Sequence, residues 1–418
     1  MKILLVASLW GYKGGIEQYL IDLVELLHQF GHKTIAMYAK KSDTPFEKEV
    51  PVSGEYLMPS LDEFPNHNNI KDVEKVLKII EDEQIDVVYI NEIKNYALIR
   101  ALNKCRPTVG IAHGCQCMCL RDGLKIFLLT RRICEYKIGL ACILHGCFLS
   151  RHPKWRFLPK FKNIVKSLHG LEAYREIKKM IVTTHYMENE LIRHGFVSNQ
   201  VPILPFFVEI PALEENNLNY NSNVILFVGR IVREKGVDVL LKALALVKHD
   251  FEAWIIGEGP YRKRCERISK RLNLQNKVKF LGWVSNDTLH KLYLKATLVV
   301  VPSIWPETFG IVGMQAMKYG KPVVAFDVGG IADWLEDGET GFLVKRMDYR
   351  AMADKITLLL TNKLLAQKMG MSGYEKALVK FDKINYIERL IKIFQSVILT
   401  HQSQKNRIIE PLKQGETN

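Results

Sequence analysis

The chain has 418 residues, enough for two domains with separate hydrophobic cores, and its 48% hydrophobic and 25% charged content excludes a disordered or fibrous protein. It carries 59 Lys and Arg residues against 45 Asp and Glu residues, a formal charge of +14. The densest surplus lies in residues 101–200, with 17 basic residues against 6 acidic ones. Such a surplus predicts a polyanionic neighbour: nucleic acid, an anionic membrane or a phosphate-bearing substrate.

The N-terminus resembles the start of a signal peptide, but its apolar run ends at Trp10-Gly11 without a cleavage-site pattern. It fits a buried first strand better. No stretch reaches the roughly 18 to 20 apolar residues that span a bilayer. We therefore expect a cytoplasmic protein whose eight cysteines are reduced.

The first half alternates short β-branched runs with helical patterns, which is typical of parallel α/β sheets. A helix is predicted from Ile16 to Leu27, with apolar residues at helical spacing and Gly31 as its stop signal. The predicted strands are 2–7, 33–39, 86–91, 108–113 and 180–184.

A polar, asparagine-rich linker at 214–223 separates the halves, and the pattern then restarts. The second set of predicted strands is 224–228, 252–257, 277–281, 298–301, 322–326 and 341–344, with helices at 236–247 and 261–272. The architecture we infer is two Rossmann-like domains. They comprise 1–213, completed by a C-terminal helix at 384–400, and 223–383, and they are followed by a polar tail at 401–418 that frays.

A glycine-rich turn follows the first strand and opens the first helix. In this turn Gly14 and Gly15 would let backbone N–H groups approach a phosphate at the N-terminus of the helix. The spacing is not G-x-G-x-x-G, so a nicotinamide cofactor is disfavoured, and no other cofactor is indicated. A plain turn between strand and helix is an equally consistent interpretation.

Two cations stand at the carboxyl end of the strand at 224–228. Arg230 follows the strand directly, and Lys235 lies in the loop before the next helix. Open α/β sheets bind ligands at this edge, where arginine can bind a phosphate bidentately and lysine adds a point charge. A phosphate site is favoured over a solvated surface pair.

The most informative stretch is P-S-I-W-P-E-T-F-G-I-V-G-M-Q-A-M at 302–317. A strand ends, a proline loop presents Glu307, and a helix is predicted to start near Thr308. Free N–H groups there would meet a diphosphate, and Glu307 could accept hydrogen bonds from sugar hydroxyls. Gln315 follows about two helical turns later on a similar face.

These motifs resemble the retaining glycosyltransferases of family 4, most densely from 223 to 348. That family has the α/β GT-B fold, two facing Rossmann-like domains with the active site in the interdomain cleft. The resemblance implies that Arg230 and Lys235 bind the donor diphosphate and Glu307 binds the donor sugar. Thr308, Phe309 and Gly310 would belong to the same donor-binding motif.

The resemblance extends to three further positions. It implies Gln315 beside the ribose, Gly14 and Gly15 on the diphosphate, and His113 near the donor sugar. At Gln315 the family usually has glutamate; glutamine keeps the hydrogen bonds but loses the charge. For His113, a hydrogen-bonded histidine at a strand end is an equally good interpretation.

No Asp-x-Asp pair occurs in the chain, so a metal carrying the diphosphate is not indicated. Six cysteines and three histidines crowd into 113–152, but their spacing matches no standard zinc pattern, and structural thiols are favoured. We name no protein nucleophile.

Residues 120–166 combine an apolar segment at 138–149 with basic residues on both sides and with Trp155 and Phe157. This composition favours docking on an anionic membrane, although a solvated surface is the alternative, and no nucleic-acid-binding motif is recognisable. The flanking basic residues are Arg131, Arg132, Arg151, Lys154, Arg156, Lys160, Lys162 and Lys166.

The sequence thus predicts a metal-independent glycosyltransferase that moves a hexose-type sugar from a nucleotide sugar, with UDP favoured, to a saccharide. We expect the acceptor to be lipid-linked and the enzyme to lie on the inner face of the plasma membrane, in envelope or exopolysaccharide synthesis. Two alternatives stay open. One is a nucleotide-sugar 2-epimerase of the same fold, and the other is a non-catalytic protein that binds sugar nucleotides or membranes.

Overall fold

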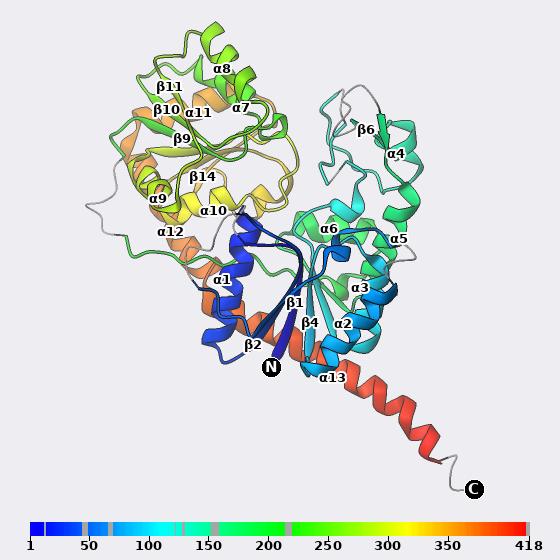
Figure 1. Cartoon of the computed structure of the whole chain (residues 1–418). Coiled ribbons are helices and arrows are strands. Elements are labelled where there is room, and N and C mark those ends of the chain that lie inside the picture. Colours follow the sequence, from blue (N-terminus) through cyan, green and yellow to red (C-terminus); the bar gives the residue numbers. More distant parts are fainter. Residues whose placement is uncertain are drawn as a thin grey trace. The chain divides into compact units, whose positions relative to one another are not determined.

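The computed structural model describes residues 1–11, 14–43, 49–65, 70–121, 123–127, 130–151, 159–213 and 220–414. Two compact units make up the chain (Figure 1). The first unit contains residues 1–125, 135–206 and 383–418, and the second contains 126–134 and 207–382. Among the described residues, no helix is both long and apolar enough to cross a bilayer.

The first unit is built on a six-stranded parallel sheet with the strand order β3-β2-β1-β4-β5-β8. All five predicted strands are confirmed, and the short, half-exposed edge strand β3 was not predicted. The strands are β1 (Lys2–Trp10), β2 (Lys33–Lys41), β3 (Gly54–Leu57), β4 (Val87–Asn91), β5 (Thr108–Ile111) and β8 (Lys179–Ile181), with the antiparallel pair β6 (Leu149–Arg151) and β7 (Pro159–Phe161) outside the sheet.

Several helices lie against this sheet because they present an apolar stripe, as α1 does with Leu20, Leu23 and Leu27. The helices of the first unit are α1 (Gly15–Gln29), α2 (Ile70–Asp82), α3 (Tyr96–Cys105), α4 (Leu140–Leu144), α5 (Ile164–Arg175), α6 (His185–Arg193) and α13 (Lys383–Gln414).

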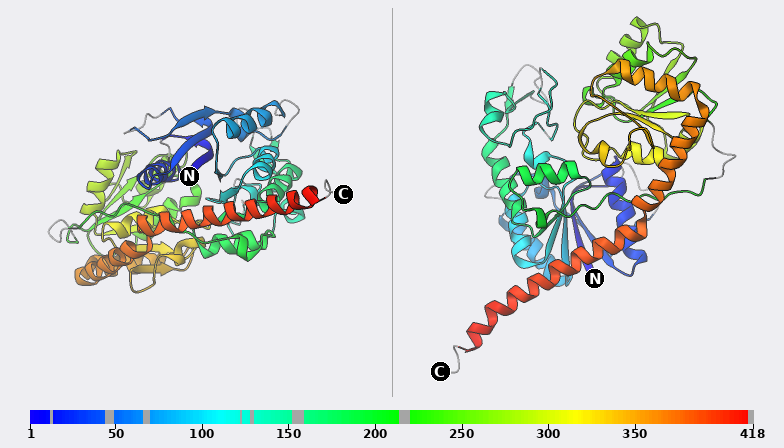
Figure 2. Two further views of the ribbon diagram at one scale, coloured as in Figure 1. Left: turned by 90° about the horizontal axis from the view of Figure 1, so that it is seen from below. Right: turned by 180° about the vertical axis from the view of Figure 1, so that it is seen from behind.

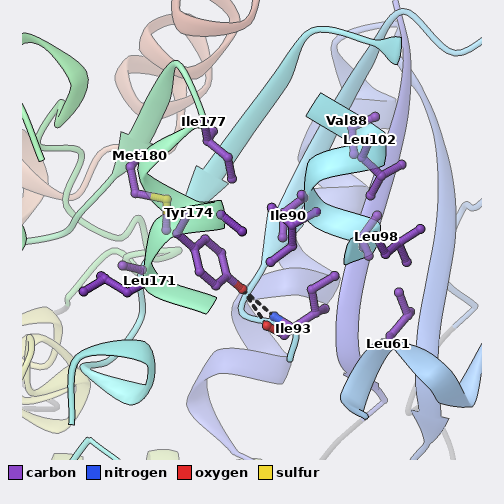
Figure 3. Packing of buried hydrophobic residues seen from close by; sticks show 14 of the residues in the cluster. Leu61, Val88, Ile90, Ile93, Leu98, Leu102, Leu171, Tyr174, Ile177 and Met180 are labelled. Atoms are coloured by element: carbon purple, nitrogen blue, oxygen red, sulfur yellow. Dashed lines mark hydrogen bonds between the residues drawn. The ribbon is translucent and has the colours of Figure 1, made fainter. Parts of the chain in front are cut away.

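Tyr174 of α5 ties this helix to the carboxyl end of β4 within the buried core (Figure 3). Its hydroxyl donates to the backbone carbonyl of Ile93 at 2.9 Å and accepts the N–H of the same residue at 2.7 Å. The ring packs among Leu171, Ile177 and Met180. Both polar groups of a buried loop residue are therefore satisfied by one side chain, which fixes where the chain leaves β4.

The C-terminal helix α13 returns to the first unit (Figure 2). Tyr386 is buried, with its hydroxyl 2.5 Å from that of Tyr19, and Phe394 meets the ring of Tyr89 edge-on at 5.5 Å. The helix continues to Gln414, so the prediction of a frayed tail from residue 401 was wrong. No glycine or proline stands between 384 and 410 to stop the helix.

The second unit repeats the design with a parallel sheet of order β11-β10-β9-β12-β13-β14, and all six predicted strands are confirmed. The strands are β9 (Val224–Val228), β10 (Glu252–Ile256), β11 (Val278–Gly282), β12 (Leu298–Val301), β13 (Val323–Phe326) and β14 (Gly341–Val344). The helices are α7 (Val237–Leu244), α8 (Arg262–Arg271), α9 (Asn286–Lys295), α10 (Ile311–Lys318), α11 (Tyr349–Thr361) and α12 (Lys363–Lys380). Because the strand order reverses between β9 and β12, the loops after these strands diverge at the carboxyl edge, where such sheets bind ligands.

Candidate active site

A buried carboxylate, Glu307, is the centre of the polar site in the second unit. It lies on the loop after β12 and is 5% exposed. Its Oε1 is 2.6 Å from Nζ of Lys235 and accepts a hydrogen bond of 2.9 Å from Nε1 of Trp305. The hydroxyl of Ser303 donates to the same oxygen. Lys235 also lies over the Trp305 ring, 5.6 Å from its centroid.

These contacts keep Glu307 ionised. Burial by itself raises the pKa of the carboxyl, but the charge of Lys235 and the hydrogen bonds from Lys235, Ser303 and Trp305 outweigh it and hold the pKa below its usual range. All of these groups contact Oε1. No described residue donates to Oε2, which leaves that oxygen able to accept a hydrogen bond from a ligand hydroxyl.

Local backbone geometry brings Lys235 to Glu307. Gly236 has φ +70°, and a Cβ on it would lie 1.9 Å from the carbonyl oxygen of Pro302. Beside this contact the N–H of Ile304 donates to the carbonyl of Glu234 at 2.9 Å. Only glycine permits such close approach at positive φ, so this residue type lets the loop after β9 lie on the loop after β12.

The loop after β13 supports Glu307 from another direction. Gly329 has φ +60°, and a Cβ there would lie 2.1 Å from the carbonyl oxygen of Glu307. The N–H of Gly330 donates to that same oxygen at 2.7 Å. The backbone of Glu307 is therefore fixed by the Gly329-Gly330 pair in the loop after β13.

The helix of the donor-binding motif, α10, starts later than the sequence predicted. α10 begins at Ile311, three residues after Thr308, because Gly310 adopts φ +89° and lies outside the helix. Phe309 is buried against Phe381, with the ring centroids 5.9 Å apart, so its side chain is part of the core.

Two predicted residues lie apart from the Glu307 contacts. Gln315 is on α10, as predicted, and its Oε1 accepts a 3.3 Å hydrogen bond from the hydroxyl of Tyr293. Arg230 is exposed directly after β9 and makes no ion pair with any acidic residue that the structure describes. Its guanidinium is thus available to an anionic ligand.

The other predicted site residues belong to the first unit. Gly14 is the N-cap of α1, and Gly15 is its first residue; both are exposed. The first turn of α1, through Ile16 and Glu17, lines a cavity of about 210 Å³ that His113 also lines. The structure therefore brings the first turn of α1 and the predicted histidine to one cavity, whereas Gly14 and Gly15 are not among its described lining residues.

His113 is buried beside Asn91, with Nε2 at 3.0 Å from the side-chain oxygen Oδ1, and its ring stacks on Phe206. Burial lowers its pKa to about 3, so the imidazole is neutral at physiological pH. Its Nδ1 is buried and has no partner among the described residues. Through Nε2, His113 is thus a hydrogen-bonded histidine at a strand end. Its contact with the donor sugar stays a prediction.

Glu92 is a site residue that the sequence did not reveal. It follows β4, has φ +35°, and lines the same cavity as His113. Its Oε1 accepts the N–H of Gly114 at 2.8 Å. Burial raises the pKa of its carboxyl to about 7, although the backbone hydrogen bonds of Gly114 and His113 lower it. The signal in the sequence was the polar pair Asn91-Glu92 at the end of a buried strand.

Replacing Glu92 with glutamine is expected to stabilise the protein increasingly as the pH rises from 5 to 8. Between its usual pKa of 4.5 and about 7, the folded state holds a proton that the unfolded state has lost, so the stability of the native protein falls as the pH rises. The variant lacks this loss, which is at most about 3.5 kcal/mol at roughly 1.4 kcal/mol per pKa unit. Urea unfolding of both proteins across this range measures it, and a pH-independent difference would contradict the assignment.

The basic region at 120–166 is only partly described. Lys154, Trp155, Arg156 and Phe157 lie outside the described residues, as do the side chains of Arg151 and Lys160. Arg131 groups with the second unit, where its Nη2 is 3.4 Å from Oδ2 of Asp238.

The seven described cysteines form no disulfide. Among the described residues, no group of three or more His, Cys, Asp or Glu side chains is arranged to hold a metal ion. Cys115, Cys142 and Cys147 instead pack within the hydrophobic core of the first unit.

Known proteins resemble the chain in both sequence and fold. Residues 211–376 match the family model described as glycosyl transferases group 1. An uncharacterized glycosyltransferase of Methanocaldococcus jannaschii is 28% identical over 380 residues, 90% of this chain and 93% of that protein. The poly(ribitol-phosphate) alpha-N-acetylglucosaminyltransferase of Staphylococcus aureus is 27% identical over 230 residues, 54% of this chain and 45% of that protein.

The solved structure of HepE from Anabaena in complex with UDP has a TM-score of 0.71 to this chain at 20% identity, covering 95% of this chain and 100% of HepE. The predicted α/β fold of two Rossmann-like sheets is confirmed. Together, the family model, the relatives and the fold support a glycosyltransferase of the GT-B class.

Proposed function

We propose that the chain is a retaining glycosyltransferase of family 4 that uses a nucleotide-diphosphate sugar, with UDP favoured, and a lipid-linked saccharide acceptor. The observation that carries the proposal is Glu307, a buried and ionised carboxylate with one oxygen free of donors among the described residues. Such a group suits sugar hydroxyls. The complex of HepE with UDP supports the choice of nucleotide. Synthesis of an envelope or exopolysaccharide glycan is the setting we infer.

The transfer breaks the bond between the anomeric carbon and the diphosphate oxygen and forms one to the acceptor oxygen on the same face. The proton of the acceptor hydroxyl passes to the leaving diphosphate. Negative charge develops on the leaving diphosphate, and preorganised cations at that point lower the barrier. Arg230, exposed after β9, can supply a bidentate contact. Lys235 would share its charge between Glu307 and the diphosphate. We propose that these cations replace a metal, since the chain has no Asp-x-Asp pair.

Incubation with a panel of UDP-, GDP- and ADP-sugars, with and without saccharide acceptors, tests the function. We expect donor consumption with one nucleotide and a product whose anomeric configuration, determined by NMR, equals that of the donor. An epimerised donor formed without acceptor would identify an epimerase instead. Nucleotide binding without turnover across the panel would identify a binding protein.

We also propose that the first unit docks on an anionic membrane from the cytoplasmic side. Its support is a surface that we call the apolar rim, formed by exposed side chains on α4, β6, β7 and the start of α5. Large exposed apolar surfaces mark interaction sites, and neighbouring lysines favour an anionic membrane. The apolar rim consists of Leu140, Ile143, Leu144, Leu149, Phe161 and Val165.

Replacing both Leu140 and Leu144 with serine is expected to weaken binding to anionic vesicles at least tenfold. These side chains are 80% and 85% exposed, and burial of one leucine contributes about 1.5–3 kcal/mol. Co-sedimentation with phosphatidylglycerol vesicles at low salt measures the change. Leu364 of α12 is equally exposed, at 80%, and Leu364→Ser is the matched control. Equal binding by the double variant and the control would refute docking through the apolar rim.

A further inference from the structure

The first unit contains a second, larger cavity of about 530 Å³, which we call the α5 cavity because the first turns of α5 line it. Ligand pockets usually measure roughly 300–1,000 Å³ and are mostly apolar. Most of the wall is likewise apolar. Its apolar lining includes Phe64, Leu120, Phe161, Tyr174 and Met180.

The charges on the wall are mainly positive. Lys94, Lys162 and Lys166 line the α5 cavity, and Glu92 is the only carboxylate among its described lining residues. Lys94 is paired with Asp62 at 2.7 Å. Lys166 lies over the ring of Phe64, 5.4 Å from the centroid, so a cation stands directly beside an apolar wall. This pairing fits an anion that is attached to an apolar group.

The α5 cavity shares lining residues with two neighbouring features. Glu92, Lys94 and Gln116 line both it and the smaller cavity that contains His113. Phe161 of the apolar rim also lines it, and this side chain is 67% exposed and stacks on Phe148. The wall thus combines an exposed aromatic ring, lysines and a half-buried carboxylate.

We infer that the α5 cavity binds a lipid phosphate, the anchor of the acceptor. The apolar chain lies against Phe64 and Phe161, the phosphate beside Lys162 and Lys166, and the attached saccharide turns a hydroxyl toward Glu92. The three kinds of group on a lipid-phosphate-saccharide match the three kinds of side chain that line the cavity: apolar, cationic and carboxylate. The saccharide part of this inference rests on the proposed function, whereas binding of the lipid phosphate does not require a donor.

Gly170 offers a way to fill the α5 cavity without disturbing the fold. It lies within α5 and lines the cavity, and an added Cβ would meet nothing within 4 Å. Leucine and alanine both favour a helix over glycine. Calorimetry with farnesyl phosphate, below its aggregation concentration, is expected to show binding to the wild type and to Gly170→Ala. Gly170→Leu should bind at least tenfold more weakly, and unchanged binding by this variant would refute the site.

The charge of the ligand is tested by Lys166→Glu. This variant should bind farnesyl phosphate at least tenfold more weakly than the wild type. Lys75 of α2, exposed and not among the cavity's lining residues, provides the matched control Lys75→Glu, which should bind normally. Farnesol should bind more weakly than farnesyl phosphate. Inorganic phosphate should not displace farnesyl phosphate. If farnesol binds as tightly, or if phosphate alone competes, the cavity is not a lipid-phosphate site.

These measurements separate the inference from the proposed function because no donor is present. If farnesyl phosphate binds as described but no nucleotide sugar is turned over, the lipid-phosphate site in the α5 cavity is supported and the transferase is refuted. Turnover with soluble saccharides, but without binding of farnesyl phosphate, would support the transferase and refute the lipid-phosphate site.

Discussion

Replacement of Glu307 with glutamine is expected to lower the rate of sugar transfer by about 10²–10³-fold, the usual cost of removing one preorganised electrostatic contact. Glutamine has nearly the same shape, so the loop after β12 can keep its course. It removes the charge that Lys235 now neutralises at 2.6 Å and that, in the proposed function, orients the sugar hydroxyls. Steady-state kinetics with the preferred donor measures the effect, and nucleotide affinity should change far less than the rate constant.

Two further variants separate chemistry from folding. Glu258 pairs with Arg262 on the surface of the same unit, and Glu258→Gln should leave turnover within twofold because exposed pairs contribute little. Lys235→Met should destabilise the protein because Glu307 would be left buried and unpaired. Combining Lys235→Met with Glu307→Gln should restore stability without restoring turnover. Retention of most activity by Glu307→Gln would remove Glu307 from the catalytic site.

Substitution of Gly329 by alanine is expected to destabilise the second unit by about 3 kcal/mol or more and to lower turnover. A non-glycine residue at positive φ costs roughly 1–2 kcal/mol. The new Cβ would also lie 2.1 Å from the carbonyl oxygen of Glu307 and within 2.8 Å of further backbone atoms of Glu307 and Pro306. Relief of that clash must move the backbone that carries the Glu307 carboxylate. Thermal unfolding and transfer kinetics of the same preparation measure both effects.

Gly338 provides the control for backbone strain alone. It has φ +79°, and a Cβ there would meet nothing within 4 Å. Gly338→Ala should therefore cost only the strain of positive φ and leave turnover unchanged. If the two alanine variants lose equal stability and equal activity, contact between Gly329 and the Glu307 backbone does not position the site.

Much of the fold could be predicted because the signals are local. Buried parallel strands are short β-branched runs, and in both units these runs alternate with helical patterns, so 224–228 and 298–301 were found as strands. The motif around Glu307 was visible for the same reason, since strand, proline loop and helix follow one another directly between residues 298 and 318.

The contacts within the candidate site could not be predicted in this way. They depend on which loops lie beside one another, and the spacing of residues in the sequence does not encode these neighbours directly. Lys235 and Glu307 are 72 residues apart and pair only because β9 lies beside β12. Glu92 is defined as a site residue by the backbone of Gly114, which belongs to the neighbouring strand end. The partner of Arg131 lies 107 residues away, at Asp238. Each of these contacts requires the order of strands in the sheet, which composition and periodicity leave open.

The position of α13 has a consequence for how the protein is made. The ribosome synthesises the first unit first, yet Tyr386, Leu390 and Phe394, which are buried in that unit, come from the last part of the chain. The second unit, residues 207–382 with the early segment 126–134, is complete before these residues emerge. Since domains generally fold as units during synthesis, the later unit can reach its native state first. The earlier one must keep part of its apolar surface uncovered until residues 386–394 have been synthesised.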